Sequence, residues 1–217
     1  MASLILFDCD GTLTNSNGII IKAVREAFED HGLQPPSKSV VLAALGMSLN
    51  AVIEGLLDRQ GIVGADVEVI AEAYRQHYVA DEVTIELYPD VLETLQKLKD
   101  RGYWMAIVTG KSKLGLDRVR ARFHLDDYFH AWRTADCCHS KPHPAMALEC
   151  MAELGVDAAD TALVGDARFD IQMAKAAGVR ALGASFDMLD GQVLYDEGAE
   201  AVVHRFDDLL RYFPSLA

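Results

Sequence analysis

Residues 4–13 read LILFDCDGTL, and this stretch decides the fold. The run from Ser3 to Phe7 is short and apolar, which is typical of a buried strand. Polar residues that favour a turn follow at once in segment 8–12, where two aspartates flank a cysteine and precede a glycine. A buried strand that ends in carboxylates predicts a sheet with a ligand site at the carboxyl ends of its strands.

Beyond this turn the sequence has a helical rhythm. From Asn17 to about Ala80, apolar residues recur at helical spacing, and no convincing strand pattern interrupts them. The first of these helices is expected to end near Gly32, ahead of the adjacent prolines at 35 and 36. We therefore expect an all-helical insert after the first strand.

Strands and helices alternate in the rest of the chain, after Tyr88 and Pro89. Strands are expected at 104–108, 129–133, 162–164, 179–184 and 201–203. Helices are expected from Asp90 (as N-cap) to Arg101, at 114–123, from Pro144 (as first helical residue) to Gly155, at 171–177 and around Leu209. Such alternation indicates βαβ units and a parallel sheet. The predicted fold is α/β, with a three-layer, Rossmann-like core of residues 1–15 and 84–217 and a helical cap of residues 16–83.

Charge and length exclude several classes of protein. The 217 residues include 33 acidic and 20 basic ones, which gives a net charge of −13. Nucleic acids and anionic membranes require a basic surface, so we expect neither as a partner. The length suits one domain with an insertion or two small domains, as a monomer or a homodimer.

The cysteines and the apolar runs indicate the compartment. The four cysteines form no CxxC pair and are expected to be free thiols, as in a reducing compartment. The first apolar run ends at Asp8 and is too short for the apolar region of a signal peptide, so we do not expect one here. The longest apolar run, 40–47, is far shorter than the ~18 residues that a membrane span needs. We expect a cytoplasmic protein.

Four polar clusters follow strand-like runs, and they resemble the motifs of one family. The clusters are 8–12, 109–111, 141–142 and 165–170. In this order they resemble the four motifs of the haloacid dehalogenase superfamily: a DxDGT signature, a hydroxyl residue, a lysine and a GDxxxD sequence. The insert is similar to the helical cap of the phosphoglycolate phosphatase-like branch. The resemblance spans the whole chain and implies a phosphatase with this fold.

The first cluster offers the groups that phosphoryl transfer needs. Asp8 is the candidate nucleophile, which would form an aspartyl-phosphate. Asp10 could deliver a proton to the leaving oxygen and then activate water. Gly11 would let the backbone turn closely around a phosphate.

Three further residues are candidates for binding the phosphate. Thr109 offers a hydroxyl and Gly110 a backbone N–H at the end of the next strand. Lys141 would hold the phosphate and offset the charge of Asp8. Lys141 could instead be a solvated surface residue, but the prolines that follow it stiffen its loop.

Four aspartates in one cleft would repel one another unless a divalent cation joined them. Oxygen ligands around a phosphate favour Mg²⁺. The family resemblance implies that Asp8, the backbone carbonyl of Asp10 and Asp166 hold the metal. It also implies that Asp170 acts directly or through water, although Asp166 and Asp170 could simply begin a helix.

Other interpretations of these motifs are weaker. A P-loop at 105–112 would need glycine at position 105, where the chain has Met105. Cys9 should point away from the two aspartates and pack inside the protein. His139 and His143 are interpreted as polar loop residues. Segment 46–50 is equally compatible with a substrate loop of the cap and with a plain turn between helices.

The predicted function is a Mg²⁺-dependent phosphatase of a small phosphorylated metabolite, with phosphoglycolate as the first candidate. A β-phosphoglucomutase-like phosphotransferase is the alternative enzyme, and a metabolite-binding module is the alternative outside enzymes. Asp10 argues against dehalogenases and phosphonate-cleaving relatives, because these lack the second aspartate. Cys9, segment 14–16 and Ala167 depart from common forms of the motifs and weaken any transfer of substrate identity.

Overall fold

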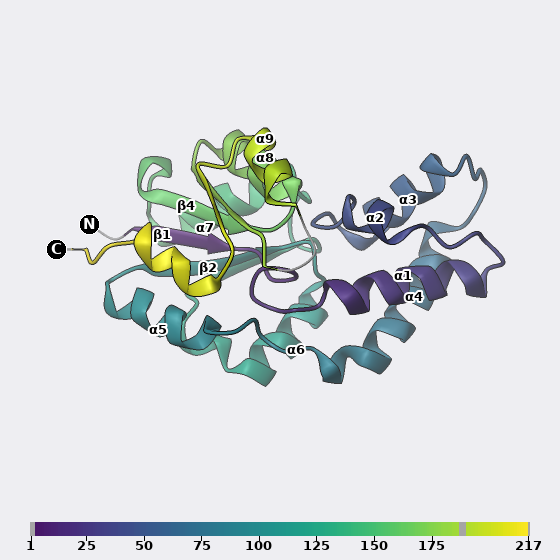
Figure 1. The fold of residues 1–217 in the computed structure, drawn as a ribbon, viewed down its shortest axis with the longest axis horizontal. Coiled ribbons are helices and arrows are strands. Elements are labelled where there is room, and N and C mark those ends of the chain that lie inside the picture. The colour runs from purple at the N-terminus through teal and green to yellow at the C-terminus, as the bar shows by residue number, and fades with distance from the viewer. Residues whose placement is uncertain (1–2, 187–189, 217) are drawn as a thin grey trace.

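The computed structural model describes residues 3–186 and 190–216 and contains one all-parallel sheet (Figure 1). Its strand order is β3-β2-β1-β4-β5-β6, so the first strand of the chain lies at the centre. The strands are β1 (Leu4–Phe7), β2 (Trp104–Thr109), β3 (Ala131–Thr134), β4 (Thr161–Gly165), β5 (Arg180–Ala184) and β6 (Ala201–Val203). This arrangement confirms the predicted α/β fold with a parallel sheet.

Helices cover both faces of the sheet because alternate strand residues point to opposite sides. Ile5 and Phe7 of β1 belong to a core cluster shared with α5 (Val91–Asp100), α6 (Lys113–Phe123) and the 3₁₀ helix η4 (Phe206–Arg211). Leu4 and Leu6 belong to the opposite cluster, shared with α7 (Ala145–Leu154), α8 (Arg168–Ala177) and α9 (Gly191–Glu197). The core therefore has the three layers that the sequence predicts.

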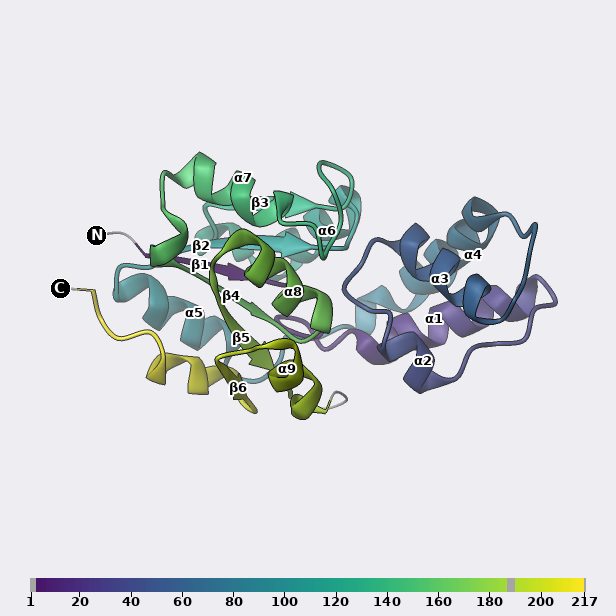
Figure 2. The ribbon, with the colours of Figure 1, turned by 90° about the horizontal axis from the view of Figure 1, so that it is seen from above.

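The segment between β1 and α5 folds into helices around a core of its own. The helices are α1 (Asn17–Asp30), α2 (Lys38–Leu42), α3 (Leu49–Arg59) and α4 (Val67–Asp81), followed by the 3₁₀ turn η1 (Glu82–Thr84). Their apolar faces form a separate cluster, in which Phe28, Leu56 and Ala71 are fully buried. Figures 1 and 2 show these helices beyond the carboxyl ends of the strands. We call this part of the molecule the cap.

The two chain segments that join cap and core run side by side. Thr14 forms a parallel bridge with Asp10 and an antiparallel bridge with Leu87. The backbone N–H of Asn15 donates to the carbonyl of Glu86, at 2.9 Å. The connection is therefore a narrow two-segment neck directly beside the first polar cluster.

Some local details differ from the sequence-based expectations. Asp90 precedes α5, but its backbone is left-handed (φ 64°) and its side chain caps nothing; the carboxylate instead pairs with Arg205 at 2.9 Å. Pro144 is the N-cap of α7 and not its first helical residue. Helix α9 was not expected, and the C-terminal helix is a 3₁₀ turn. Within the described residues, no helix is long and apolar enough to cross a bilayer.

Candidate active site

Three carboxylates meet where the strand order reverses, beside the central strand. Asp8 follows β1, Asp166 follows the neighbouring strand β4, and Asp170 lies in the first turn of α8. All three are buried, and a carboxylate oxygen from each lies within 4.8 Å of the others. Ligands of open parallel sheets bind at such a reversal. The sheet thus brings together Asp8, predicted as the nucleophile, with Asp166 and Asp170, which are predicted as metal ligands.

Lys141 is the cation of this cluster. Its Nζ atom lies 2.5 Å from Oδ1 of Asp8 and 2.6 Å from Oδ1 of Asp170, and its side chain is fully buried. Burial raises the pKa of Asp8 to about 7, although Lys141 acts in the opposite direction. Burial and the charges of Asp8 and Asp170 also raise the pKa of Asp166. One lysine does not balance three buried carboxylates.

The cluster fits a divalent metal ion. Three carboxylates and one ammonium group leave two negative charges uncompensated when all are ionised. Oδ1 of Asp170 is buried and accepts no aligned hydrogen bond, even though Lys141 is close. An all-oxygen donor set of this charge suits Mg²⁺. The geometry and the charge deficit therefore agree with the expected cofactor.

Neutral donors hold Asp166 in place. Thr12 donates from its hydroxyl to one carboxylate oxygen and Asn17 from its amide to the other, each at 3.3 Å. Gly11 has a positive φ of 82°, and a Cβ atom there would collide with the Asp166 carboxylate. Gly11 therefore makes room for an acidic side chain. Neither Thr12 nor Asn17 was a candidate site residue from the sequence, because only the folded chain places them beside β4.

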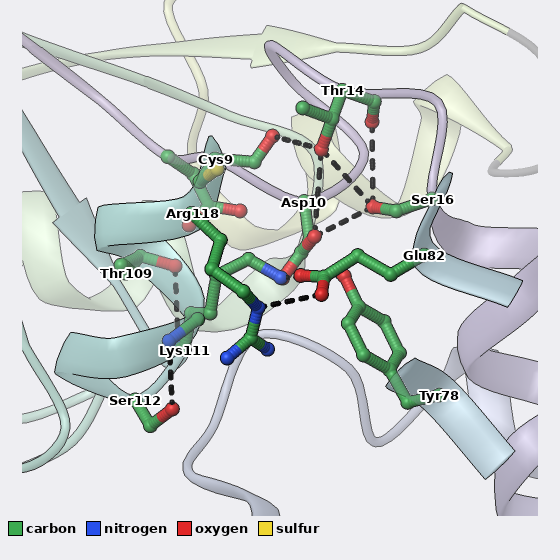
Figure 3. A network of polar contacts seen from close by, with 12 residues as sticks. Cys9, Asp10, Thr14, Ser16, Tyr78, Glu82, Thr109, Lys111, Ser112 and Arg118 are labelled. Carbon is green, nitrogen blue, oxygen red and sulfur yellow. Dashed lines mark hydrogen bonds and ion pairs between the residues drawn. The ribbon is translucent and has the colours of Figure 1, made fainter. Parts of the chain in front are cut away.

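Asp10 does not belong to the cluster of three carboxylates. Figure 3 shows its carboxylate beside Thr14 and Ser16, at the neck of the cap. Oδ1 accepts a hydrogen bond of 2.6 Å from the hydroxyl of Ser16 and a longer one from Thr14. Oδ2 lies 2.9 Å from Nζ of Lys111. The side chain is therefore oriented from several sides, which suits an acid–base group more than a carboxylate ligand of the metal.

Lys111 is the most important residue that the sequence analysis missed. Its Nζ atom also donates to the hydroxyl of Tyr78 on cap helix α4, at 2.8 Å. Burial lowers the pKa of Lys111, but Asp10 and the nearby phenols outweigh it and raise this pKa well above its ordinary value. The lysine therefore stays charged and joins the proposed acid–base group to the cap. Its position directly after the candidate phosphate-binding residues Thr109 and Gly110 could have indicated that Lys111 belongs to the site.

The second motif lies under a loop of the cap. Thr109 is buried at the end of β2, and its hydroxyl accepts a hydrogen bond from the backbone N–H of Lys111. A Cβ atom at Gly110 would collide with the backbone carbonyl of Met47. The N–H of Ser48 donates to the hydroxyl of Ser140 on the loop of Lys141, at 2.7 Å. Segment 46–50 thus contacts the core next to two motifs.

A cavity of about 450 Å³ lies between the core and the cap at this site. Asp8, Asp10, Thr109 and Gly110 line its core side, and segment 46–50 with parts of α1 and α4 lines its cap side. Segment 46–50 therefore contributes to the cavity wall, in addition to joining two helices. Cys9 is fully buried in the core cluster, as expected. His139 and His143 are exposed, and neither belongs to the buried acidic cluster.

Comparison with known proteins identifies the class that this fold and site define. A model of the haloacid dehalogenase-like hydrolases matches residues 5–184, and the chain belongs to this family. The resemblance inferred from the four motifs is confirmed.

Individual relatives cover almost the whole chain. It is 30% identical to a probable phosphatase, IndB, of Dickeya dadantii, over 97% of this chain and 93% of that protein. It is also 30% identical to a phosphoglycolate phosphatase of Pectobacterium atrosepticum, over 95% and 90% of the two chains. A hydrolase from Pseudomonas syringae has the same fold, with a TM-score of 0.86 at 24% identity over 97% of both chains.

Proposed function

We propose that the protein is a Mg²⁺-dependent phosphatase that hydrolyses a small phosphorylated metabolite through an aspartyl-phosphate. The observation that carries this proposal is the position of Asp8. It is paired with the cation Lys141, lies in one cluster with two further buried carboxylates, and lines the same cavity as Asp10. The family and the phosphatase names of its relatives support the same conclusion.

The proposed reaction has two steps. In the first, a carboxylate oxygen of Asp8 attacks the phosphorus atom of the monoester, and the bond from phosphorus to the alcohol oxygen breaks. Asp10 gives its proton to the departing alkoxide. In the second, Asp10 takes a proton from water, which attacks the phosphorus of phospho-Asp8 and releases inorganic phosphate. Both residues then return to their starting states.

The phosphate oxygens need partners during both steps. The Thr109 hydroxyl and the Gly110 N–H lie on the cavity wall and are proposed to bind them. Lys141 would offset the charge on the nucleophile and on the transferring group. Gly11 provides the close backbone turn next to this position.

The metal would be held by Asp8, Asp166 and the backbone carbonyl of Asp10, with Asp170 acting directly or through water. Bound Mg²⁺ supplies positive charge that stabilises the transferring phosphoryl group. Thr12 and Asn17 fix the Asp166 carboxylate for that role. Binding at this place would also remove the charge deficit of the buried cluster.

The division of labour between core and cap is part of the proposal. Residues 1–15 and 84–217 would carry the chemistry, and residues 16–83 would cover the site and exclude water while substrate is bound. The contacts of segment 46–50 with the core support this role for the cap.

Phosphate release from a panel of phosphate compounds tests the proposal. The panel holds phosphoglycolate, for which one relative is named, together with sugar phosphates, nucleotides and pyrophosphate. We expect turnover with Mg²⁺, none with a chelator, and a loss of roughly 10⁴-fold or more in Asp8→Asn. Asp58→Asn, at an exposed cap position, is the matched control and should keep full activity.

Two outcomes would contradict a phosphatase. Isomerisation of a sugar phosphate that is faster than phosphate release would assign the phosphotransferase instead. Binding of a metabolite that persists in Asp8→Asn, with no turnover by the folded wild type, would assign the binding module.

A further inference from the structure

The cap side of the cavity is mainly apolar, although Asn17, Ser48, Asn50 and Arg75 also line it. Its wall includes Ile20, Val24, Met47, Leu49, Tyr74 and Tyr78. Ile20, Val24 and Tyr78 belong to the cap's own buried cluster, whereas Met47, Leu49 and Tyr74 are only partly buried and pack at its edge. The wall that faces the leaving group of a bound phosphate ester is therefore a continuation of a hydrophobic core.

Within residues 3–186 and 190–216, each cation that lines the cavity has a carboxylate partner. Lys111 lies 2.9 Å from Asp10. The two arginines, Arg75 and Arg118, lie 2.7 Å from Glu68 and 2.6 Å from Glu82, and Figure 3 shows the second of these pairs. A substrate carboxylate that entered this space would share these cations with their present partners and would lie near several acidic groups, so its charge would be only partly compensated.

A positively charged leaving group is disfavoured as well. Tyr78 lies beside the proposed acid–base group, and Nζ of Lys111 is 4.7 Å from the centre of its ring (Figure 3). Because this ring already interacts with one cation, a second cation beside it would meet electrostatic repulsion. The nearby carboxylates are themselves paired with Lys111, Arg75 and Arg118.

Tyr74 offers a surface for a ring. It stacks on Tyr78, with centroids 5.7 Å apart and planes at 24°, and it lines the cavity while remaining partly accessible. A planar or apolar group is the chemistry that such a surface accepts. The cavity of about 450 Å³ also has room for a group much larger than a glycolyl unit.

We propose that the preferred substrate is a phosphate monoester of an uncharged, ring-bearing alcohol whose ring packs between Tyr74 and the apolar wall of the cap. This inference rests on the proposed phosphatase function and narrows it. Phosphoglycolate, with its carboxylate and its short carbon chain, is then a poor substrate.

Four esters of primary alcohols test the inference on the wild-type enzyme with Mg²⁺. Benzyl phosphate carries the uncharged ring, and 4-carboxybenzyl phosphate adds only a carboxylate. Phosphoglycolate has the carboxylate without the ring, and phosphocholine has a cation. We expect kcat/KM for benzyl phosphate to exceed each of the other three by about tenfold or more.

A substitution on the cap wall should change this order. Leu49→Lys places an unpaired cation on the partly buried wall. We expect the ratio of kcat/KM for 4-carboxybenzyl phosphate to that for benzyl phosphate to rise about tenfold. Leu148→Lys, at an exposed position on α7 of the core, is the matched control and should leave the ratio unchanged.

The outcomes separate the two proposals. Phosphoglycolate, 4-carboxybenzyl phosphate or phosphocholine hydrolysed as well as benzyl phosphate would overturn the inference and leave the phosphatase assignment intact. No phosphate release from any ester or from the metabolite panel, by folded protein with Mg²⁺, would overturn the proposed function itself.

Discussion

The two walls of the cavity are built in different ways. The core wall includes polar and charged residues that follow strand ends, among them Asp8, Asp10 and Lys111. Lys141 and Asp166 do not line the cavity; they are buried next to Asp8 and support this wall. The cap wall is made mainly of apolar side chains on helices α1 and α4 and on segment 46–50, with a few polar residues such as Asn50 and Arg75 among them. Strand pairing fixes the first wall through the backbone, whereas helix packing determines the second. If the proposed roles hold, reaction chemistry and substrate choice have separate structural origins in this molecule.

The largest effect should come from the core wall. Lys141→Met removes the cation between Asp8 and Asp170, so the nucleophile loses its charge partner and the phosphate loses a ligand. We expect kcat/KM to fall by roughly 10³-fold for every substrate. Lys97→Met, at an exposed residue of α5, serves as control. A loss that differed strongly between substrates would show that the core wall also selects them.

Lys111 connects the two walls, so its removal tests how separate they are. In Lys111→Met both Asp10 and Tyr78 lose a partner. We expect kcat to fall by about 10²-fold with little change in KM, because orientation of the acid–base group is lost. Steady-state kinetics beside Lys113→Met, an exposed neighbour, measure this. A rise in KM with unchanged kcat would mean that Lys111 acts mainly by holding the cap through Tyr78, and not by orienting Asp10.

Metal binding should stabilise the core wall. Mg²⁺ at about 100 times its Kd contributes about 2.7 kcal/mol to the free energy of unfolding, which corresponds to a Tm increase of roughly 5–10 °C for a protein of this size. Asp166→Asn should remove most of this increase, because Asp166 is a proposed ligand of the metal. Asp136→Asn, at an exposed residue on the cavity rim, should retain it. An equal Tm increase in both variants would place the metal elsewhere.

The smallest effect concerns the contact between the walls. Gly110→Ala places a methyl group against the Met47 carbonyl, so segment 46–50 has to move away from the core. We expect kcat/KM to fall by about tenfold, mainly through KM. Gly55→Ala adds a methyl group on cap helix α3, where it meets no atom within 4 Å. Wild-type kinetics in Gly110→Ala would mean that the contact of segment 46–50 has no role in binding.

The core wall could be predicted from the sequence for a physical reason. Asp8, Thr109 and Asp166 each stand next to the end of an apolar strand, and parallel pairing brings strand ends together. Asp90 is the N-cap residue of α5, as predicted, but its left-handed backbone and its pairing with Arg205, which replace a side-chain cap, depend on tertiary contacts. The helical propensity of the residues around Asp90 predicts neither its backbone conformation nor its ion pair.

The cap wall was not predictable in the same way. Its helices could be recognised from apolar spacing, but which side chains face the cavity depends on how α1 and α4 pack, and α1 is amphipathic with many buried positions. The contact of Lys111 with Tyr78 joins a core residue to a cap residue far away in the sequence, so no local sequence pattern predicts it. The hydrogen bond from Ser16 to Asp10 was not predicted either, because segment 14–16 departs from common forms of the motif.

The central place of β1 also determines how the molecule opens in solution. Its residues are fully buried and paired on both sides, and the N–H of Asp8 donates to the carbonyl of Val164. Amide hydrogens there are expected to exchange with deuterium only when the whole core unfolds, whereas those of α2, with one buried residue, should exchange through local fluctuations. On gentle heating, α2 will therefore loosen while the strand that precedes Asp8 stays paired.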